Sequence, residues 1–379
     1  MKISVRLSKI LAGILLVIIL LVLAGAIGFA ALQVRGKSRL YRNASEMPDL
    51  SKAALSQEAE GDGEDNDPDQ TTAGQTDGEK ETEDWQEGDV RYQGVHYRYN
   101  PDILTFLFLG IDKKTEVRAV KNGIDGGQAD TLFLLVLNPH TEKISVIGIP
   151  RDTMTEIDIY GKDGRFERTE VLQICLQHGY GDGAASSCER TVKAVSNLFY
   201  GLPIGGYCAV NMGAIGSIND AVGGVEVTAL EDIPKSKIKK GDTVLLKGNQ
   251  AYEYLHNRDV KTAASAEARL ERQKQYVIAY AKKATEMMKK DITLPLTLYQ
   301  SLTKYMVTDL SVDEISYLAT NLSAYTFDGG DMSSLEGEVK LGNDRFEEFY
   351  ADEQALYELI LKVFYEEVAP KGGTEEMAD

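Results

Sequence analysis

Three almost entirely apolar stretches constrain the fold of this chain more than any other feature. They are ILTFLFLG (103–110), TLFLLVLN (131–138) and ISVIGIP (144–150). Short apolar runs without polar alternation are typical of strands that are buried on both faces. The second and third runs are separated only by PHTEK, and we therefore expect these two strands to form a hairpin.

Helical patterns alternate with the apparent strands. The spacing predicts helices at 169–178, 187–200, 249–255 and 266–289, a short helix that ends at Gly223-Gly224, and strands at 206–212 and 225–230. This alternation indicates an α/β fold with a mixed central sheet flanked by helices, an α/β/α sandwich. We expect this domain to occupy residues 97–368 and to be followed by a tail at 369–379.

The amino terminus contains an uncharged run that is long enough to cross a membrane. Three cations at positions 2, 6 and 9 precede 23 residues without a charge, from 10 to 32. A helix of that length spans a bilayer. We predict a cytoplasmic tail at 1–9, a transmembrane anchor at 10–34 and a single-pass protein of the cell membrane, with the carboxyl-terminal domain extracytoplasmic. A cleaved signal peptide is the alternative.

The net charge of −18 comes mainly from one segment. Residues 46–89 contain 16 acidic residues and two lysines, a net charge of −14, with almost no apolar side chains. A segment of this composition cannot bury enough apolar surface to fold. We interpret residues 35–96 as an acidic, disordered linker. The folded domain is then close to neutral, so its charge does not exclude an anionic ligand.

Charged residues follow or precede the apolar strands directly. Asp112 follows the first strand, Asp130 precedes the second, and Arg151 and Asp152 follow the third. Ligands of α/β proteins bind at strand ends, and a buried guanidinium needs a partner. Two carboxylates are enough for Mg²⁺ when phosphates supply other oxygen ligands. Each aspartate taken alone is more simply explained as a turn or capping residue.

A second cluster lies in YLHNRDV and ARLERQKQY. Arg258 follows one predicted helix, and Arg269, Arg272 and Gln273 fall on one face of the next helix together with Tyr276. A solvated helix face is the simpler explanation of such a stripe. However, several arginines match the geometry of phosphate oxygens, and with two aspartates they suggest a magnesium-bound diphosphate.

The three cysteines suggest no metal site. Cys175 and Cys188 could form a bridge outside the cytoplasm, or both could be small core residues. The chain has no CxxC motif and no His/Cys cluster.

Taken as a set, the motifs resemble the LytR-CpsA-Psr family of cell-envelope proteins. The resemblance covers about residues 103–280. It is carried by LFLGID, ADTLFLLVLNP, IGIPRDT, YGDG, INDAVGGVEV, LKGNQAYEYLHNRD and ARLERQ, in this order and behind an apparent membrane anchor. The resemblance implies a Mg²⁺-dependent phosphotransferase. Such an enzyme takes a phosphoglycan from a polyprenyl-pyrophosphate carrier and joins it to peptidoglycan.

The resemblance also implies roles for individual residues. Asp112 and Asp130 would bind magnesium, Arg151 and Arg258 would act in catalysis and clamp the pyrophosphate, and Asp152 would orient Arg151 or take the acceptor's proton. The remaining predicted pyrophosphate-binding residues are Arg269, Arg272, Gln273 and Lys114. The chain departs from the family pattern at Gln128 and His256, where arginine is usual, and at Ala266, where aspartate is usual.

Two classes of function therefore remain open at this stage. The retained aspartates and arginines favour the transferase, whereas the three departures favour a protein that binds a polyprenyl phosphate or wall glycan without catalysis. A hydrolase of lipid pyrophosphate is a further alternative, because water could replace the acceptor hydroxyl. The predicted location and the absence of a nucleic-acid-binding motif argue against a regulator that binds DNA.

Overall fold

The structure is a computed structural model that describes residues 28–42, 46–53, 85–121, 123–257, 265–291, 293–322, 324–327, 329–342 and 346–368. The chain divides into two compact units. One, here called the helical unit, contains Met1–Arg42, Lys114–Glu116 and Asn211–Gly329. The other, the sheet unit, contains Asn43–Lys113, Val117–Val210 and Gly330–Asp379.

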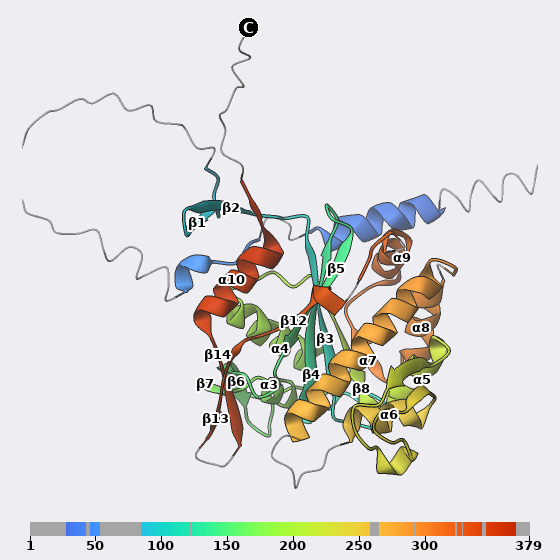
Figure 1. The fold of residues 1–379 in the computed structure, drawn as a ribbon. Coiled ribbons are helices and arrows are strands. Elements are labelled where there is room, and N and C mark those ends of the chain that lie inside the picture. Colours follow the sequence, from blue (N-terminus) through green and yellow to red (C-terminus); the bar gives the residue numbers. More distant parts are fainter. Residues whose placement is uncertain are drawn as a thin grey trace, which may run out of the picture. The chain divides into compact units, whose positions relative to one another are not determined.

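A mixed sheet forms the centre of the sheet unit (Figure 1). Its strands within this unit lie in the order β8-β3-β4-β5-β12. They are β3 (Leu104–Ile111), β4 (Ala129–Asn138), β5 (Lys143–Ile149), β8 (Gly206–Asn211) and β12 (Met332–Ser334). β4 pairs antiparallel with both β3 and β5, whereas β12 is parallel to β5. The predicted mixed sheet and the predicted hairpin are both confirmed.

Apolar residues make these strands the core of the sheet unit. Leu107, Leu109 and Leu134 are completely buried. The unit also contains helices α3 (Cys175–Gly179), α4 (Ala185–Leu198) and α10 (Glu353–Phe364). α3 packs on β4, and α4 buries Cys188 and Val195. Helices thus flank the sheet, as the sequence predicts. Cys175, Cys188 and Cys208 form no disulfide within the described residues, and the first two are buried.

The helix predicted at 169–178 is largely wrong. Residues 166–173 form strand β7 (Phe166–Gln173), which pairs antiparallel with β6 (Met154–Tyr160), and only the short α3 follows. The stretch contains helix-favouring Glu and Arg, but β-branched Thr169 and Val171 favour the strand. Pairing also gives Thr169 a partner, because its hydroxyl donates to the Asp158 carboxylate opposite, at 2.8 Å. Long-range pairing here overrides local propensity.

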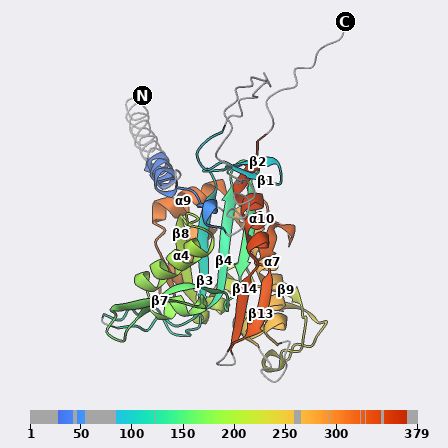
Figure 2. The same cartoon turned by 90° about the vertical axis from the view of Figure 1, so that its left-hand side faces the viewer.

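Small sheets complete the sheet unit. One consists of β1 (Val90–Tyr92), β2 (Val95–Tyr99) and β15 (Tyr365–Glu367), and another of β13 (Gly337–Leu341) and β14 (Glu347–Ala351), drawn in red in Figure 2. β1 and the start of β2 precede residue 97, so the folded part begins earlier than predicted. Alternating aromatic and β-branched residues in VRYQGVHYRY favour these strands over a linker.

The helical unit contains five labelled helices and three short strands among the described residues. The helices are α5 (Ile215–Ala221), α6 (Asn249–His256), α7 (Ser265–Met288), α8 (Leu294–Leu302) and α9 (Val312–Asn321). The strands are β9 (Val225–Thr228), β10 (Thr243–Leu246) and β11 (Met306–Thr308). Val225, Leu246 and Tyr254 are completely buried in the core, which Tyr276 of α7 joins. The helices predicted at 249–255 and 266–289 are confirmed.

The predicted membrane anchor lies mostly outside the described residues. Its carboxyl end belongs to a helix at 28–40, where Gln33 donates to Ser316 of α9 at 3.2 Å and Arg39 pairs with Asp313 at 3.2 Å. No helix within the described ranges is both long and apolar enough to cross a membrane. The predicted tail, anchor and linker boundaries otherwise stay predictions.

We expect Asp89 to make the sheet unit sensitive to acid. Burial opposes its charge, but bonds from Arg98, from the Gln86 N–H and from His96 outweigh burial and lower the pKa of Asp89 from 3.8 to about 2. The stabilisation is therefore complete above pH 3.8 and is lost as the pH falls toward 2. Asp89→Asn should lower the free energy of unfolding at pH 7 by about 2 kcal/mol.

Urea unfolding at pH 7, 5 and 3 measures this effect. The exposed Asp163→Asn is the matched control, and it should change the free energy of unfolding by less than about 0.5 kcal/mol. An equal, small effect of both substitutions would show that the Asp89 pairs do not stabilise the unit.

Candidate functional site

A charged cluster in the sheet unit surrounds Arg151, which follows β5. Its guanidinium donates to Asp130 of β4 and, at 2.7 Å, to the Gln128 side-chain oxygen. Its Nε lies 3.4 Å from the Asp152 carboxylate, and Nη2 lies 3.6 Å from the Cys175 sulfur. Arg151 thus has carboxylates on two sides, as a charge at the edge of an apolar sheet requires.

The backbone of the turn after β5 holds Arg151 in place. The Thr153 N–H and hydroxyl both donate to the Pro150 carbonyl, at 3.0 and 2.6 Å. The Arg151 carbonyl accepts from the N–H of Cys175, the first residue of α3, at 3.1 Å. The turn and α3 therefore brace each other, and proline at its start limits the conformations of the turn.

Strand pairing places Asp112 at the same edge of the sheet as Asp130. The β3–β4 register ends with Ile111 opposite Ala129, and the Asp112 N–H donates to the Gln128 carbonyl at 3.0 Å. Asp112 is exposed, whereas the Asp130 side chain is only 6% exposed. The structure therefore brings together four of the predicted site residues: Asp112, Asp130, Arg151 and Asp152.

The cluster combines a fixed cation with a neutral thiol. Burial opposes the charge on Arg151, but the contact with Cys175 and the carboxylates of Asp130 and Asp152 outweigh burial and raise the pKa of Arg151. Burial raises the pKa of Cys175 to about 11, so its thiol is protonated at neutral pH. The Arg151 side chain is still 26% exposed, and a ligand can reach it.

Sequence analysis missed Cys175 as a neighbour of Arg151. In the sequence the two residues are 24 positions apart and share no motif, and β6 and β7 form the hairpin between them. The Gln128 side chain was identified only as a departure from the family pattern, yet it is a direct partner of Arg151.

The helical unit contains Arg272, which lies entirely within its core. The guanidinium pairs with Glu231, and it donates to the backbone carbonyls of Tyr254, at 2.7 Å, and Asn257. The residue is 0% exposed, and burial lowers the pKa of Arg272 to about 10, which keeps it charged at neutral pH. These bonds cap the end of α6 and fix the residue before Arg258. They give Arg272 a structural role, and contact with pyrophosphate stays a prediction.

The other predicted binding residues are less completely described. Arg269 and Gln273 lie on α7 and are partly buried, whereas Arg258 lies outside the described residues. The departures His256 and Ala266 belong to α6 and α7.

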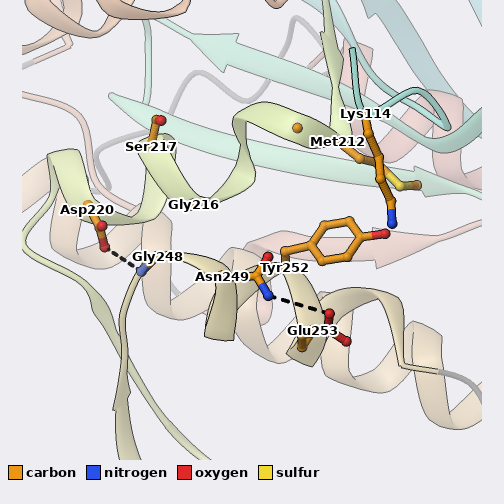
Figure 3. Close-up of a pocket in the computed structure, with 10 residues that line it drawn as sticks. Lys114, Met212, Gly216, Ser217, Asp220, Gly248, Asn249, Tyr252 and Glu253 are labelled. Carbon is orange, nitrogen blue, oxygen red and sulfur yellow. Dashed lines mark hydrogen bonds between the residues drawn. The ribbon is translucent and has the colours of Figure 1, made fainter. Parts of the chain in front are cut away.

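Lys114 lines a pocket of about 400 Å³ in the helical unit (Figure 3). Its ammonium lies 4.9 Å from the centre of the Tyr252 ring. The other lining residues come from the 3-10 turn before α5, from α5 and from the start of α6: Met212, Gly213, Gly216, Ser217, Asp220, Gly248, Asn249 and Glu253. Asp220, Asn249, Tyr252 and Glu253 lie in the motifs INDAVGGVEV and LKGNQAYEYLHNRD, but the sequence did not indicate that they share a pocket with Lys114, because the lining residues are spread over 140 positions.

Among the described residues, no group of three or more His, Cys, Asp and Glu side chains is arranged to hold a metal ion. The chemistry of Asp112 and Asp130 nevertheless fits Mg²⁺, which accepts as few as two protein carboxylates when phosphate and water complete its shell.

The fold and the cluster define a mixed α/β protein with an arginine held among carboxylates at the strand ends. Comparison with known families identifies the protein further. The profile of the LytR_cpsA_psr family matches residues 69–360, which is more than half of the chain. The chain belongs to this family, as the motifs predict.

Relatives of known name support the assignment. The polyisoprenyl-teichoic acid–peptidoglycan teichoic acid transferase TagU of Halalkalibacterium halodurans is 29% identical over 222 residues, which are 58% of this chain and 65% of that protein. The protein of the same name from Bacillus cereus is 27% identical over 262 residues, 69% of this chain and 77% of that protein. This chain therefore spans slightly less than two thirds of the first relative.

Solved structures show the same fold. The crystal structure of B. subtilis TagV matches with a TM-score of 0.52 at 23% identity, over 69% of this chain and 94% of that chain. A structure of TagT bound to LI-WTA matches with a TM-score of 0.52 at 21% identity, over 70% of this chain and 92% of that chain.

We expect Arg272→Met to destabilise the helical unit strongly. The substitution leaves Glu231 and the carbonyls of Tyr254 and Asn257 without their donor, and breaking a buried ion pair costs about 3–5 kcal/mol. Lys274→Met on the same helix is the control, because its pair with Glu271 is exposed and contributes less than about 1 kcal/mol. Thermal and urea unfolding compare the two variants, and equal stability would contradict the structural role of Arg272.

Proposed function

We propose that this protein is a Mg²⁺-dependent phosphotransferase that attaches a cell-wall glycopolymer to peptidoglycan. The donor is a phosphoglycan on a polyprenyl-pyrophosphate carrier, and residues 10–34 anchor the enzyme in the cell membrane with the domain at 97–368 outside. Arg151 is the observation that carries the proposal. It is a half-buried guanidinium, positioned by its turn and open to a ligand, in a family whose relatives are named teichoic acid transferases.

The charge of the cluster supports a metal requirement. Asp112, Asp130 and Asp152 contribute three negative charges against the single positive charge of Arg151, a net charge of −2. Lys113 is nearby in sequence, but it pairs with Asp125 at 3.0 Å. A pyrophosphate would be repelled by this cluster unless a cation joins it. Mg²⁺ held by Asp112 and Asp130 would supply that charge and neutralise phosphate oxygens.

The proposed reaction is a displacement at phosphorus. An acceptor sugar hydroxyl forms a new O–P bond to the phosphate attached to the glycan, the P–O bond between the two phosphates breaks, and polyprenyl phosphate leaves with that bond's electron pair. Arg151 donates hydrogen bonds to the phosphoryl oxygens, where charge develops. Asp152, whose carboxylate lies 3.4 Å from Arg151 Nε, would take the acceptor's proton or orient Arg151.

A binding protein without catalysis is the second candidate. Gln128 favours it, because this neutral amide lies against Arg151 where the family usually has an arginine, and it adds no positive charge to stabilise a phosphoryl transition state. Hydrolysis of the lipid pyrophosphate is a third outcome of the same chemistry, with water as acceptor.

The transfer assay separates these candidates. The full-length chain in detergent is incubated with a polyprenyl-pyrophosphate-linked oligosaccharide and peptidoglycan fragments, with Mg²⁺ or with a chelator, and the products are identified by mass spectrometry. We expect glycan joined to peptidoglycan only with Mg²⁺. Free phosphoglycan would indicate the hydrolase, and lipid binding without any product would indicate the binding protein.

Arg151→Lys tests the role of the guanidinium in the same assay. Lysine keeps the charge but loses the fork that holds two oxygens, so we expect transfer to fall by about tenfold or more while the protein remains folded. Arg168→Lys, on the exposed face of β7, is the matched control and should transfer at the wild-type rate. Equal rates for wild type and Arg151→Lys would remove Arg151 from the reaction.

A further inference from the structure

The pocket of the helical unit contains a buried hydroxyl without a partner. Tyr252 is 8% exposed, and its phenol oxygen is buried and makes no hydrogen bond to any described residue. A buried polar group of this kind costs about 1–3 kcal/mol. Tyrosine hydroxyls that persist in such positions are candidates for contact with a ligand or water.

The surroundings of Tyr252 form a built site. Its ring stacks on His256, with ring centres 5.1 Å apart, and Figure 3 shows its hydroxyl directed toward the end of Lys114. Gly216 allows α5 to approach the residue before α6, because a Cβ at Gly216 would lie 3.1 Å from the backbone of Gly248. The pocket wall is therefore fixed by backbone packing, and the exposed Lys114 also lines the pocket.

The pocket carries charged groups of both signs. Asp220 accepts the Gly248 N–H at 2.8 Å, which lowers the pKa of Asp220 and keeps it ionised at neutral pH. Glu253 adds a second carboxylate, which Lys235 partly offsets at 3.5 Å. Lys114 is the one lining cation among the described residues, and Lys247 also acts on the Asp220 carboxylate, so the pocket presents hydrogen-bond donors and acceptors of both charge signs.

A neutral sugar satisfies the same groups. Its hydroxyls can donate to the carboxylates of Asp220 and Glu253 and accept from Lys114 or the Tyr252 hydroxyl. The amide of Asn249 and the hydroxyl of Ser217, which also line the pocket, can both donate and accept. A volume of about 400 Å³ is at the lower end of the range for small-ligand sites.

We propose that this pocket is a subsite for a neutral sugar ring, with the Tyr252 hydroxyl as a specific hydrogen-bonding group. The assignment of that ring to the glycan of the reaction rests on the proposed function. The same chemistry serves a ring of the peptidoglycan acceptor or a ring of the carried glycan. The affinity for the sugar itself depends only on the pocket, and it can be measured without any transfer.

Binding of three probes to the full-length chain in detergent tests the proposal. The probes are an N-acetylglucosamine disaccharide, a peptidoglycan disaccharide fragment and inorganic pyrophosphate, each titrated calorimetrically. Tyr252→Phe removes only the hydroxyl, and Tyr317→Phe on α9 removes one outside the pocket. We expect Tyr252→Phe to weaken sugar binding by about fivefold, whereas Tyr317→Phe and both pyrophosphate titrations remain unchanged.

Thermal unfolding of the same variants separates a ligand role from a structural one. Because the Tyr252 hydroxyl has no protein partner among the described residues, Tyr252→Phe should retain or raise the melting temperature. A lowered melting temperature with unchanged sugar affinity would overturn the subsite, as would sugar binding that is equal in all variants.

Two further comparisons test the source of the sugar and the proposed function: the affinities for the two sugar-bearing ligands, and sugar binding against transfer. Tighter binding of the peptidoglycan fragment than of the sugar-bearing lipid donor would assign the subsite to the acceptor, and the reverse order would assign it to the donor. Sugar binding that depends on Tyr252, without any transfer product, would leave the subsite established and the transferase refuted. Transfer at the wild-type rate with no sugar affinity in the pocket would establish the transferase and refute the subsite.

Discussion

The ion pair between Arg151 and Asp130 is the interaction on which the candidate site depends. Asp130 lies within β4, and its side chain is almost completely buried, so its charge would be costly without the guanidinium. The pair therefore couples the end of one central strand to the turn that follows its neighbour. The β4–β5 register and the bonds of the Pro150–Thr153 turn determine where the two groups meet. A site built in this way has little freedom to move, which suits electrostatic stabilisation of a developing charge.

Burial distinguishes Arg151 from Arg272, although the sequence suggests similar roles for both. Arg272 donates to one carboxylate and two carbonyls and is closed to solvent, whereas Arg151 remains partly exposed among groups that include a neutral amide and a thiol. The N–H groups of Arg272 donate to acceptors inside the protein. Part of the Arg151 guanidinium, by contrast, is accessible to the oxygen atoms of a ligand. Residue type alone does not predict this difference, because Arg272 lies on the face of α7 that turns toward the core, whereas Arg151 lies in the turn after β5.

The central sheet was predictable because its strands are apolar on both faces. An unbroken apolar run indicates a buried strand whichever strands it pairs with. The 166–173 stretch was mistaken for a helix because β7 is mostly exposed, and its identity depends on cross-strand partners such as Asp158. The site was predictable in part for the same reason. Asp112, Asp130, Arg151 and Asp152 adjoin predictable strand ends. Cys175 reaches its place through the β6–β7 hairpin, and Tyr252 lies in a quoted motif but lines the pocket through helix packing that the motif does not encode.

The neutral side chain of Gln128 explains how the cluster can hold one cation in a defined place. Its oxygen accepts from Arg151, and a second guanidinium at this position would compete for Asp130 and repel Arg151. The cluster therefore has more carboxylates than cations. An anionic ligand would need a further cation, either bound to the ligand or already bound at the cluster. The two proposed ligands therefore differ in chemistry: a metal-bound phosphate at the cluster and the uncharged ring of a sugar in the pocket of the helical unit.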